Sequence, residues 1–228
     1  MHESDEQRDQ KLEELSALST HLLSQVEAER AALAKELHDE LGGLITAAKM
    51  DLSWLSSRVG GSLDAECNDK LNSVMLMLNQ AMVLKRRVVE NLRPSLLDHF
   101  GLAVALRSHF EDHCRRAGIE CVATLADETL ALDPVVQLTL FRVAQEALVG
   151  IIGRGGAKNV EVVIEPDAQG YVMVVGDDGA PMNTDLVYSM PSVRHRIFAA
   201  GGTVEAEVRP AHGNRIRVFV PRSAAISA

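Results

Sequence analysis

The feature that most constrains this chain is a long, uninterrupted run of helix-compatible sequence near its N-terminus. Residues 7–59 contain no proline, and their only glycines are the pair Gly42 and Gly43. Apolar side chains recur in this run at spacings of three, four or seven residues: Leu12, Leu15, Leu18, Leu22, Val26, Leu33, Leu37, Leu41, Leu44, Ala48, Leu52, Leu55 and Val59. This spacing predicts one very long helix. An apolar stripe flanked by Glu, Lys and Arg is typical of a coiled coil or helical bundle, so the helix needs a partner.

A second helix is predicted to fold back along the first. The sequence Gly60-Gly61-Ser62 interrupts the pattern, Asp64 is placed to cap a new helix, and Pro94 ends it. Residues 1–92 therefore predict a helical hairpin, which two copies of the chain could complete as a four-helix bundle. The alternative is a hairpin packed on its own C-terminal domain, and the first helix is too long for the remaining residues to cover.

The rest of the chain alternates between helical and strand patterns, so the predicted fold class is α+β. A linker is expected at 93–102, a folded domain at 103–221 and a disordered tail at 222–228. Helices are predicted at 102–117, 133–152 and up to 200, with strands at 119–125, 159–165, 171–176, 203–209 and 215–220.

Net charge and cysteine content indicate which partners and which cellular compartment to expect. A formal net charge of −9 opposes binding to nucleic acid or to an anionic membrane. The cysteines Cys67, Cys114 and Cys121 form no CxxC pair, which suits a reducing compartment, and each is expected to be buried or half-buried. The N-terminus is charged and no apolar run of membrane-spanning length is evident, so a cytoplasmic location is expected.

The chemically informative segment lies in the middle of the first helix, where Glu29-Arg30 precedes the run ELHDELGG at residues 36–43. A neutral imidazole is a nucleophile near physiological pH, and a nearby carboxylate can fix its tautomer, so His38 and Asp39 are a candidate nucleophile and base. Adjacent residues do not face each other on a helix, so Asp39 has to reach around or act through water. Taken alone, His38 would be a solvated helix residue and Asp39 an ion-pair partner of Lys35.

This segment resembles the phosphoacceptor box of the two-component histidine kinases related to the nitrate sensors. The resemblance continues in order through NLRP at 91–94, Leu97-Asp98 and Gly101-Leu102, FRVAQEAL at 141–148, Asp177-Asp178-Gly179, and residues 194–202. It implies a dimerisation hairpin followed by an α/β sandwich similar to the histidine kinase/Hsp90-like ATPase domain. In that family the histidine takes the γ-phosphate of ATP and passes it to a response-regulator aspartate. The implied nucleotide contacts are Glu146, Asp177 and Gly179.

Departures from the family pattern predict a degenerate nucleotide site. Gly150 stands where the family has an asparagine that helps to hold Mg²⁺, and glycine offers no oxygen ligand in its side chain. Arg154-Gly155 replaces a usual His-Ala pair, and Pro181 begins a segment without the glycines of the family's nucleotide lid. Gly43 replaces a glutamine that orients water during dephosphorylation of the regulator. Gly42 and Gly43 weaken the helix, so a packing or docking reason for them is expected.

Two further patterns are set aside. The glycines at 150, 153, 155 and 156 suggest a phosphate loop, but the GKS or GKT ending is absent, so a helix terminus is predicted instead. His99, His109 and His113 lack a further ligand at suitable spacing, so no metal site is predicted.

The sequence thus favours a homodimeric phosphotransfer protein in which His38, assisted by Asp39, relays phosphoryl groups between receiver domains of response regulators. Mg²⁺ would come with the receiver, and no bound cofactor is predicted. The first alternative is an ATP-dependent sensor histidine kinase that autophosphorylates His38. The second alternative is a non-catalytic scaffold that binds a regulator.

Overall fold

The computed structural model describes residues 2–59, 61–125, 132–182, 191–209 and 213–222. By compactness the chain divides into two units, residues 25–94 and residues 1–24 with 95–228. Each unit is described by itself.

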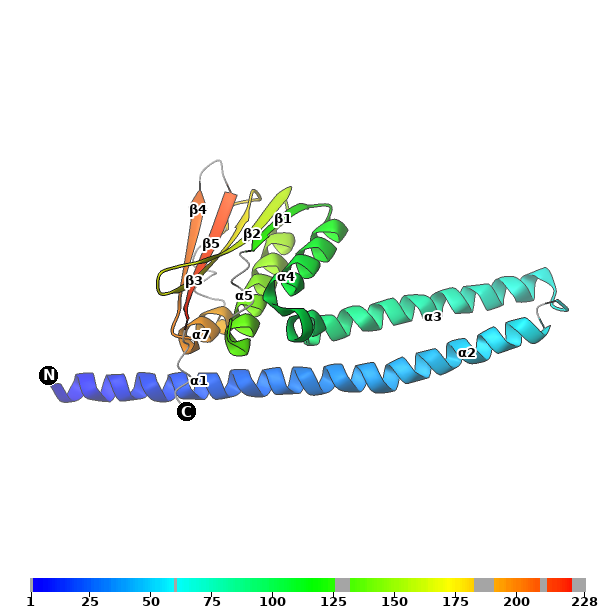
Figure 1. The fold of residues 1–228 in the computed structure, drawn as a ribbon, viewed down its shortest axis with the longest axis horizontal. Helices are drawn as coiled ribbons and strands as arrows, with labels where there is room; N and C mark the ends of the chain where they lie inside the picture. The colour runs from blue at the N-terminus through cyan, green and yellow to red at the C-terminus, as the bar shows by residue number, and fades with distance from the viewer. Residues whose placement is uncertain (1, 60, 126–131, 183–190, 210–212, 223–228) are drawn as a thin grey trace. The chain divides into compact units, whose positions relative to one another are not determined.

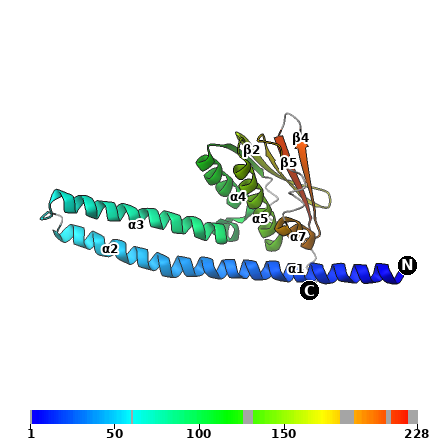
Figure 2. The same cartoon turned by 180° about the vertical axis from the view of Figure 1, so that it is seen from behind.

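The predicted long helix is present as three consecutive segments, α1 (His2–Glu36), a π-helical turn η1 (Leu37–Leu41) and α2 (Gly42–Val59). The helix α3 (Ala65–Leu92) runs back beside α2, which completes the hairpin (Figures 1 and 2). Asp64 caps α3 as predicted, because its Oδ1 accepts the backbone N–H of Cys67 at 2.7 Å. This hydrogen bond lowers the pKa of the Asp64 carboxyl. Cys67 is exposed, so the expectation that it is buried or half-buried is wrong.

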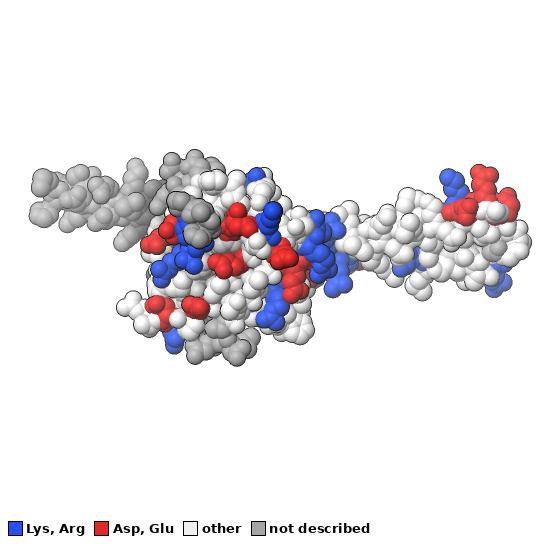
Figure 3. All heavy atoms as spheres, turned by 90° about the horizontal axis from the view of Figure 1, so that it is seen from above, with Lys and Arg blue, Asp and Glu red and all other residues white. Residues whose placement is uncertain are grey.

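The hairpin covers little of its own apolar stripe. Ala34 and Ile45 are buried, at 4% and 8% exposure. Large apolar side chains that remain exposed on η1, α2 and α3 include Leu41, Leu44, Met50, Trp54, Leu55, Val59, Val74, Leu76, Met77, Val83, Leu84 and Val88. Residues 71–84 of α3 include no charged residue, and the middle of the hairpin shows few charges in Figure 3. A surface of this kind marks an interaction site on a folded protein.

The C-terminal unit holds one five-stranded mixed sheet, in the order β1-β2-β3-β5-β4. The strand β1 is parallel to β2, and the remaining neighbours are antiparallel. The strands are β1 (Glu120–Leu125), β2 (Asn159–Pro166), β3 (Gly170–Asp177), β4 (Thr203–Arg209) and β5 (Gly213–Pro221). The last strand begins earlier than predicted, so Asn214 lies in a strand and not in a turn.

Three helices lie against the sheet: α4 (Ser95–Ala117), α5 (Pro134–Arg154) and α7 (Pro191–Ala199) (Figure 1). In β2 the alternate residues Val160, Val162 and Ile164 are buried while Glu161 between them is exposed, as expected where helices cover one face of a sheet. This arrangement confirms the predicted α+β fold with a sandwich domain.

Two local features set the helix ends. A helix already begins at Ser95, and it is kinked at Gly101, where φ is 78° and ψ is −180°. The helix α5 begins as predicted, with Asp133 as its cap and Pro134 in its first turn, and ends at Gly155, where φ is 73°. The glycine-rich run is therefore a helix terminus, as predicted, and not a phosphate loop.

The helix α5 is also long and apolar enough to cross a membrane by length and composition, although no apolar run of that length was expected from the sequence. Its apolar window is 56% buried, and its residues Leu140, Phe141 and Leu148 belong to the core of the sandwich. Packing against the sheet therefore accounts for its composition. The cytoplasmic location stays a prediction.

Candidate functional site

His38 lies on the π-helical turn that joins α1 to α2, and its side chain is exposed, as is that of Asp39. A π turn inside an α-helix shifts the backbone hydrogen-bond pattern and frequently marks a functional position. The backbone N–H of Gly42 donates to the carbonyl oxygen of Asp39 at the end of this turn. The imidazole of His38 is therefore accessible to a reaction partner.

The neighbour of His38 across the hairpin is Lys85, on α3. Its Nζ donates to the backbone oxygen of His38 at 3.5 Å. A Cβ atom placed on Gly42 would lie 2.7 Å from the same Nζ, whereas a Cβ on Gly43 would meet nothing within 4 Å. Gly42 thus leaves the space that the Lys85 ammonium occupies, which is a packing reason of the kind expected for this glycine. Sequence reasoning missed Lys85 because it is 47 positions from His38.

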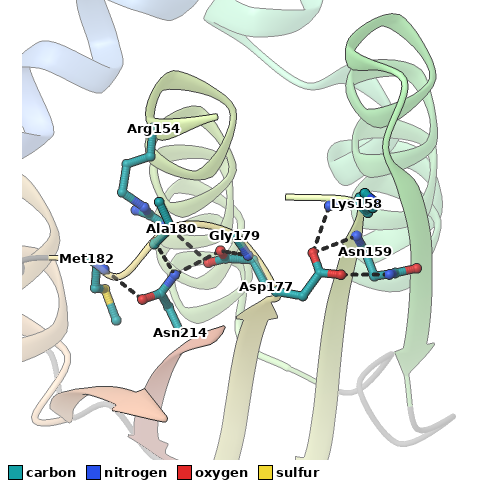
Figure 4. Close-up of polar contacts among 9 residues, drawn as sticks. Arg154, Lys158, Asn159, Asp177, Gly179, Ala180, Met182 and Asn214 are labelled. Atoms are coloured by element: carbon teal, nitrogen blue, oxygen red, sulfur yellow. Dashed lines mark hydrogen bonds and ion pairs between the residues drawn. The ribbon is translucent and has the colours of Figure 1, made fainter. Parts of the chain in front are cut away.

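Asp177, the predicted adenine contact, ends strand β3 and is 6% exposed. Its Oδ1 accepts the backbone N–H of Gly179 at 3.0 Å and Nδ2 of Asn214 at 2.9 Å. Its Oδ2 accepts Nη2 of Arg154, from the end of α5, at 2.8 Å (Figure 4). The structure therefore brings together two of the predicted contacts, Asp177 and Gly179. The third, Glu146, is half-buried on α5 and is not a hydrogen-bond partner of Asp177.

The ion pair between Arg154 and Asp177 matters for nucleotide binding. The side chain of Asp177 is 4% exposed and that of Arg154 is 24% exposed, so the pair is largely shielded from water. Oδ1 of Asp177 already accepts two hydrogen bonds and Oδ2 accepts one, so an adenine amino group would have to share Oδ2 with the Arg154 guanidinium. Together with Gly150, this pairing means that the described residues do not fit a nucleotide in the way the family pattern requires. The segment from Pro181, in which the glycines of the family's nucleotide lid are absent, falls partly on residues 183–190, which lie outside the described residues.

The turn around Asp177 is held by two residues that sequence reasoning did not single out as site residues. Asn214 is 1% exposed, and its Oδ1 accepts the backbone N–H of Met182 at 2.7 Å while its Nδ2 also donates to the oxygen of Ala180 at 2.9 Å. Asp178 binds Asn159 through a backbone N–H at 2.9 Å and the side-chain amide at 2.7 Å (Figure 4). These hydrogen bonds from Asn159 lower the pKa of the Asp178 carboxyl. A network of side-chain and backbone hydrogen bonds therefore holds the turn.

Two histidines of α4, His109 and His113, pack against each other and against the core of the sandwich. The rings of His109 and His113 lie with their centroids 4.0 Å apart and their planes tilted by 40°, and His109 meets the Phe141 ring edge to face at 5.3 Å. Burial, followed by the nearby His113, Arg116 and Arg142, lowers the pKa of His109 to about 3. Within the described ranges, no group of three or more His, Cys, Asp or Glu side chains is arranged to hold a metal ion.

Comparison with known proteins links both parts of the site to one class of signalling protein. The profile of a family described as histidine kinase matches residues 29–97, which include His38, the π-helical turn and Lys85.

Sequence similarity to known proteins extends beyond residues 29–97 into the C-terminal sandwich domain. The histidine-protein kinase/phosphatase UhpB of Salmonella typhimurium is 29% identical over 212 residues, which cover 90% of this chain and 41% of that protein. The sensor histidine kinase MctS of Rhizobium johnstonii is 31% identical over 166 residues, which cover 73% of this chain and 36% of that protein. The sensor histidine kinase LiaS of Bacillus subtilis is 27% identical over 202 residues, which cover 87% of this chain and 55% of that protein. The chain spans less than two thirds of the length of each relative.

Among solved structures, the histidine kinase domain of a blue-light activated histidine kinase from Erythrobacter litoralis has a similar fold. The TM-score is 0.50 and the identity 14%, and the match covers 77% of this chain and 94% of that one. At this identity the likeness supports the fold alone.

Proposed function

This chain belongs to the two-component sensor histidine kinase family, and we propose that it acts in signal transduction by carrying a phosphoryl group on His38 and passing it to a response-regulator aspartate. The observation that carries the proposal is the exposed His38 on a π-helical turn within the segment that matches the family. Receiver domains of response regulators are the corresponding partners.

The chemistry requires a nucleophile and a proton acceptor from this chain. The unprotonated ring nitrogen of His38 forms a bond to phosphorus while the bond from phosphorus to the donor's leaving oxygen breaks, and that oxygen keeps the electron pair. The proton on the other ring nitrogen passes to Asp39 or to water. Transfer to a receiver aspartate reverses these steps, with Mg²⁺ supplied by the receiver.

Two sources of the phosphoryl group compete, and the comparisons favour ATP. All three named relatives are histidine kinases, so the ATP-dependent kinase fits the comparisons better than the relay.

The geometry of the sandwich favours a receiver as the source. Arg154 binds Oδ2 of Asp177, and Gly150 provides no side-chain oxygen for Mg²⁺, so the residues of the sandwich fit Mg²⁺-ATP poorly. The relay therefore remains the second candidate, on the strength of the ion pair between Arg154 and Asp177.

We also propose that two copies of the hairpin form a four-helix bundle. The exposed apolar side chains of α2 and α3 would be buried by packing against a second hairpin, which presents a surface with the same pattern.

A labelling experiment separates these readings. The purified chain is incubated with Mg²⁺ and radiolabelled ATP, and separately with a radiolabelled phosphorylated receiver domain, with His38→Ala as the control. Label from ATP that is lost in His38→Ala identifies a kinase, and label only from the receiver identifies a relay. No label on His38 from either donor would contradict the proposed function and favour the alternative of a non-catalytic scaffold that binds a regulator.

A further inference from the structure

The side chain of Lys85 occupies an unusual place for a lysine on a helical hairpin. It is half-buried, and its Nζ lies 3.5 Å from the backbone oxygen of His38. Lysine side chains ordinarily extend their charged end into water. Here the ammonium, although still at the exposed surface, lies against the backbone of the predicted phosphoacceptor, where a Cβ atom on Gly42 would come within 2.7 Å of it.

A positive charge at this place has a chemical use. A phosphoryl group in transfer spreads negative charge over three oxygens, and its stabilisation depends on positioned cations and hydrogen-bond donors. The lysine ammonium is a compact charge with three donors on a flexible stem, and it binds phosphate as a point charge. Rotation of that stem would carry Nζ from the carbonyl of His38 toward a group bound on its ring.

We propose that Lys85 is a phosphoryl-binding residue, whose ammonium binds the oxygens of the phosphoryl group while that group is transferred to or from His38. This inference rests on the proposed function of His38. Lys85 gives up no proton in the step. Its hydrogen bond moves from the carbonyl of His38 to the phosphoryl oxygens, and it lowers the barrier by balancing their charge.

Phosphoramidate tests this role without nucleotide or receiver. In this reaction a His38 ring nitrogen bonds to phosphorus, the nitrogen–phosphorus bond of the reagent breaks, and ammonia leaves with a proton. We expect Lys85→Met to slow phosphorylation of His38 by about tenfold, the effect of losing one close charge, and Lys85→Arg to restore most of the rate. Arg87→Met is the matched control, because it removes one charge from the other side of the same helix and should leave the rate unchanged.

The two adjacent glycines provide a test in which Lys85 itself is not substituted. Gly42→Ala would push Nζ away from His38, while Gly43→Ala adds the same methyl group into open space. Both substitutions favour the helix. We expect Gly42→Ala to slow phosphorylation and Gly43→Ala to leave its rate unchanged. The comparison distinguishes displacement of the Lys85 ammonium from a general effect of adding a methyl group to this helix.

A spectroscopic readout separates binding from a structural effect. A neighbouring cation favours the more negative form of a phosphoryl group, so the pH midpoint of the phosphorus-31 signal of phosphorylated His38 should rise in Lys85→Met. Equal rates and equal midpoints in Lys85→Met and the unchanged chain would overturn the inference while leaving the proposed function intact. Failure of phosphoramidate to label His38 in the unchanged chain would overturn both.

Discussion

At the scale of single residues, the ion pair between Arg154 and Asp177 bears directly on the source of the phosphoryl group. Replacing Arg154 by Gln removes the positive charge beside Oδ2 of Asp177 and shortens the side chain, so this oxygen becomes more available to an adenine amino group. We expect ATP affinity, measured by calorimetry, to rise by about tenfold, the worth of one hydrogen bond to a charged acceptor. The variant should lose about 2 kcal/mol of unfolding free energy because a shielded carboxylate loses its partner.

Arg107→Gln, an exposed change on α4, serves as the control for this experiment and should alter neither quantity. Weaker ATP binding by Arg154→Gln than by the unchanged chain would show the opposite role, in which Arg154 itself contacts the nucleotide.

A second residue-scale prediction concerns His109. Its pKa is about 3 in the folded chain against 6.5 ordinarily, because burial and the nearby positive groups disfavour its protonated form. Its Nε2 has no hydrogen-bond partner among the described residues. Since the unfolded chain takes up this proton first, the contribution of His109 to stability is complete above pH 6.5 and is lost as the pH falls from there toward 3.

Urea unfolding of the unchanged chain and of His109→Gln at pH 7.5 and pH 5 checks this expectation. The unchanged chain should lose about 1–2 kcal/mol more than the variant between these two values. Parallel losses in the two proteins would mean that His109 is protonated equally in the folded and unfolded states.

At the scale of elements, the kink in α4 depends on Gly101. Its φ of 78° and ψ of −180° fall in a region that is essentially confined to glycine. We expect Gly101→Ala to lower the unfolding free energy by about 1–3 kcal/mol, seen as a lower midpoint in thermal unfolding followed by circular dichroism.

Gly153→Ala is the matched control for that substitution. Gly153 lies inside α5, and a Cβ atom there would meet nothing within 4 Å. The added methyl should therefore leave stability unchanged or raise it by up to about 1 kcal/mol. An equal effect of the two substitutions would show that the kink at Gly101 is not under backbone strain when a side chain is present.

At the scale of the whole molecule, the exposed stripe of the hairpin predicts a dimer. Leu44 and Leu55 are 69% and 42% exposed and lie eleven residues apart, which places them on the same face of the helix. Replacing both by Glu should weaken dimerisation by about a hundredfold, since each apolar side chain contributes about 1.5 kcal/mol or more when buried.

Light scattering after size-exclusion chromatography over a concentration series measures this change. The unchanged chain and the control Ser53→Glu, which adds charge at an exposed polar position, should keep the mass of two chains. A monomeric unchanged chain at micromolar concentration would contradict the proposed bundle.

The long helix, the caps of α3 and α5 and the candidate phosphoacceptor could be predicted from the sequence, whereas the π-helical turn and the start of α4 at Ser95 could not. Apolar spacing predicted the long helix, and Asp64 and Asp133 predicted the caps of α3 and α5, because these features depend on residues within a few positions of one another. The motifs that carry the family resemblance are also short and local, although they are spread from Glu29 to residues 194–202. The expected departure from the family's nucleotide lid falls partly on residues 183–190, which lie outside the described residues.

Only the tertiary structure decided which distant side chains meet. The contact of Lys85 with His38 depends on the register of the hairpin, and the hydrogen bond from Asn214 to Asp177 depends on β5 pairing with β3. Arg154 reaches Asp177 because α5 ends beside the end of β3. No local pattern encodes these pairings, since each arises from packing between segments that are far apart along the chain.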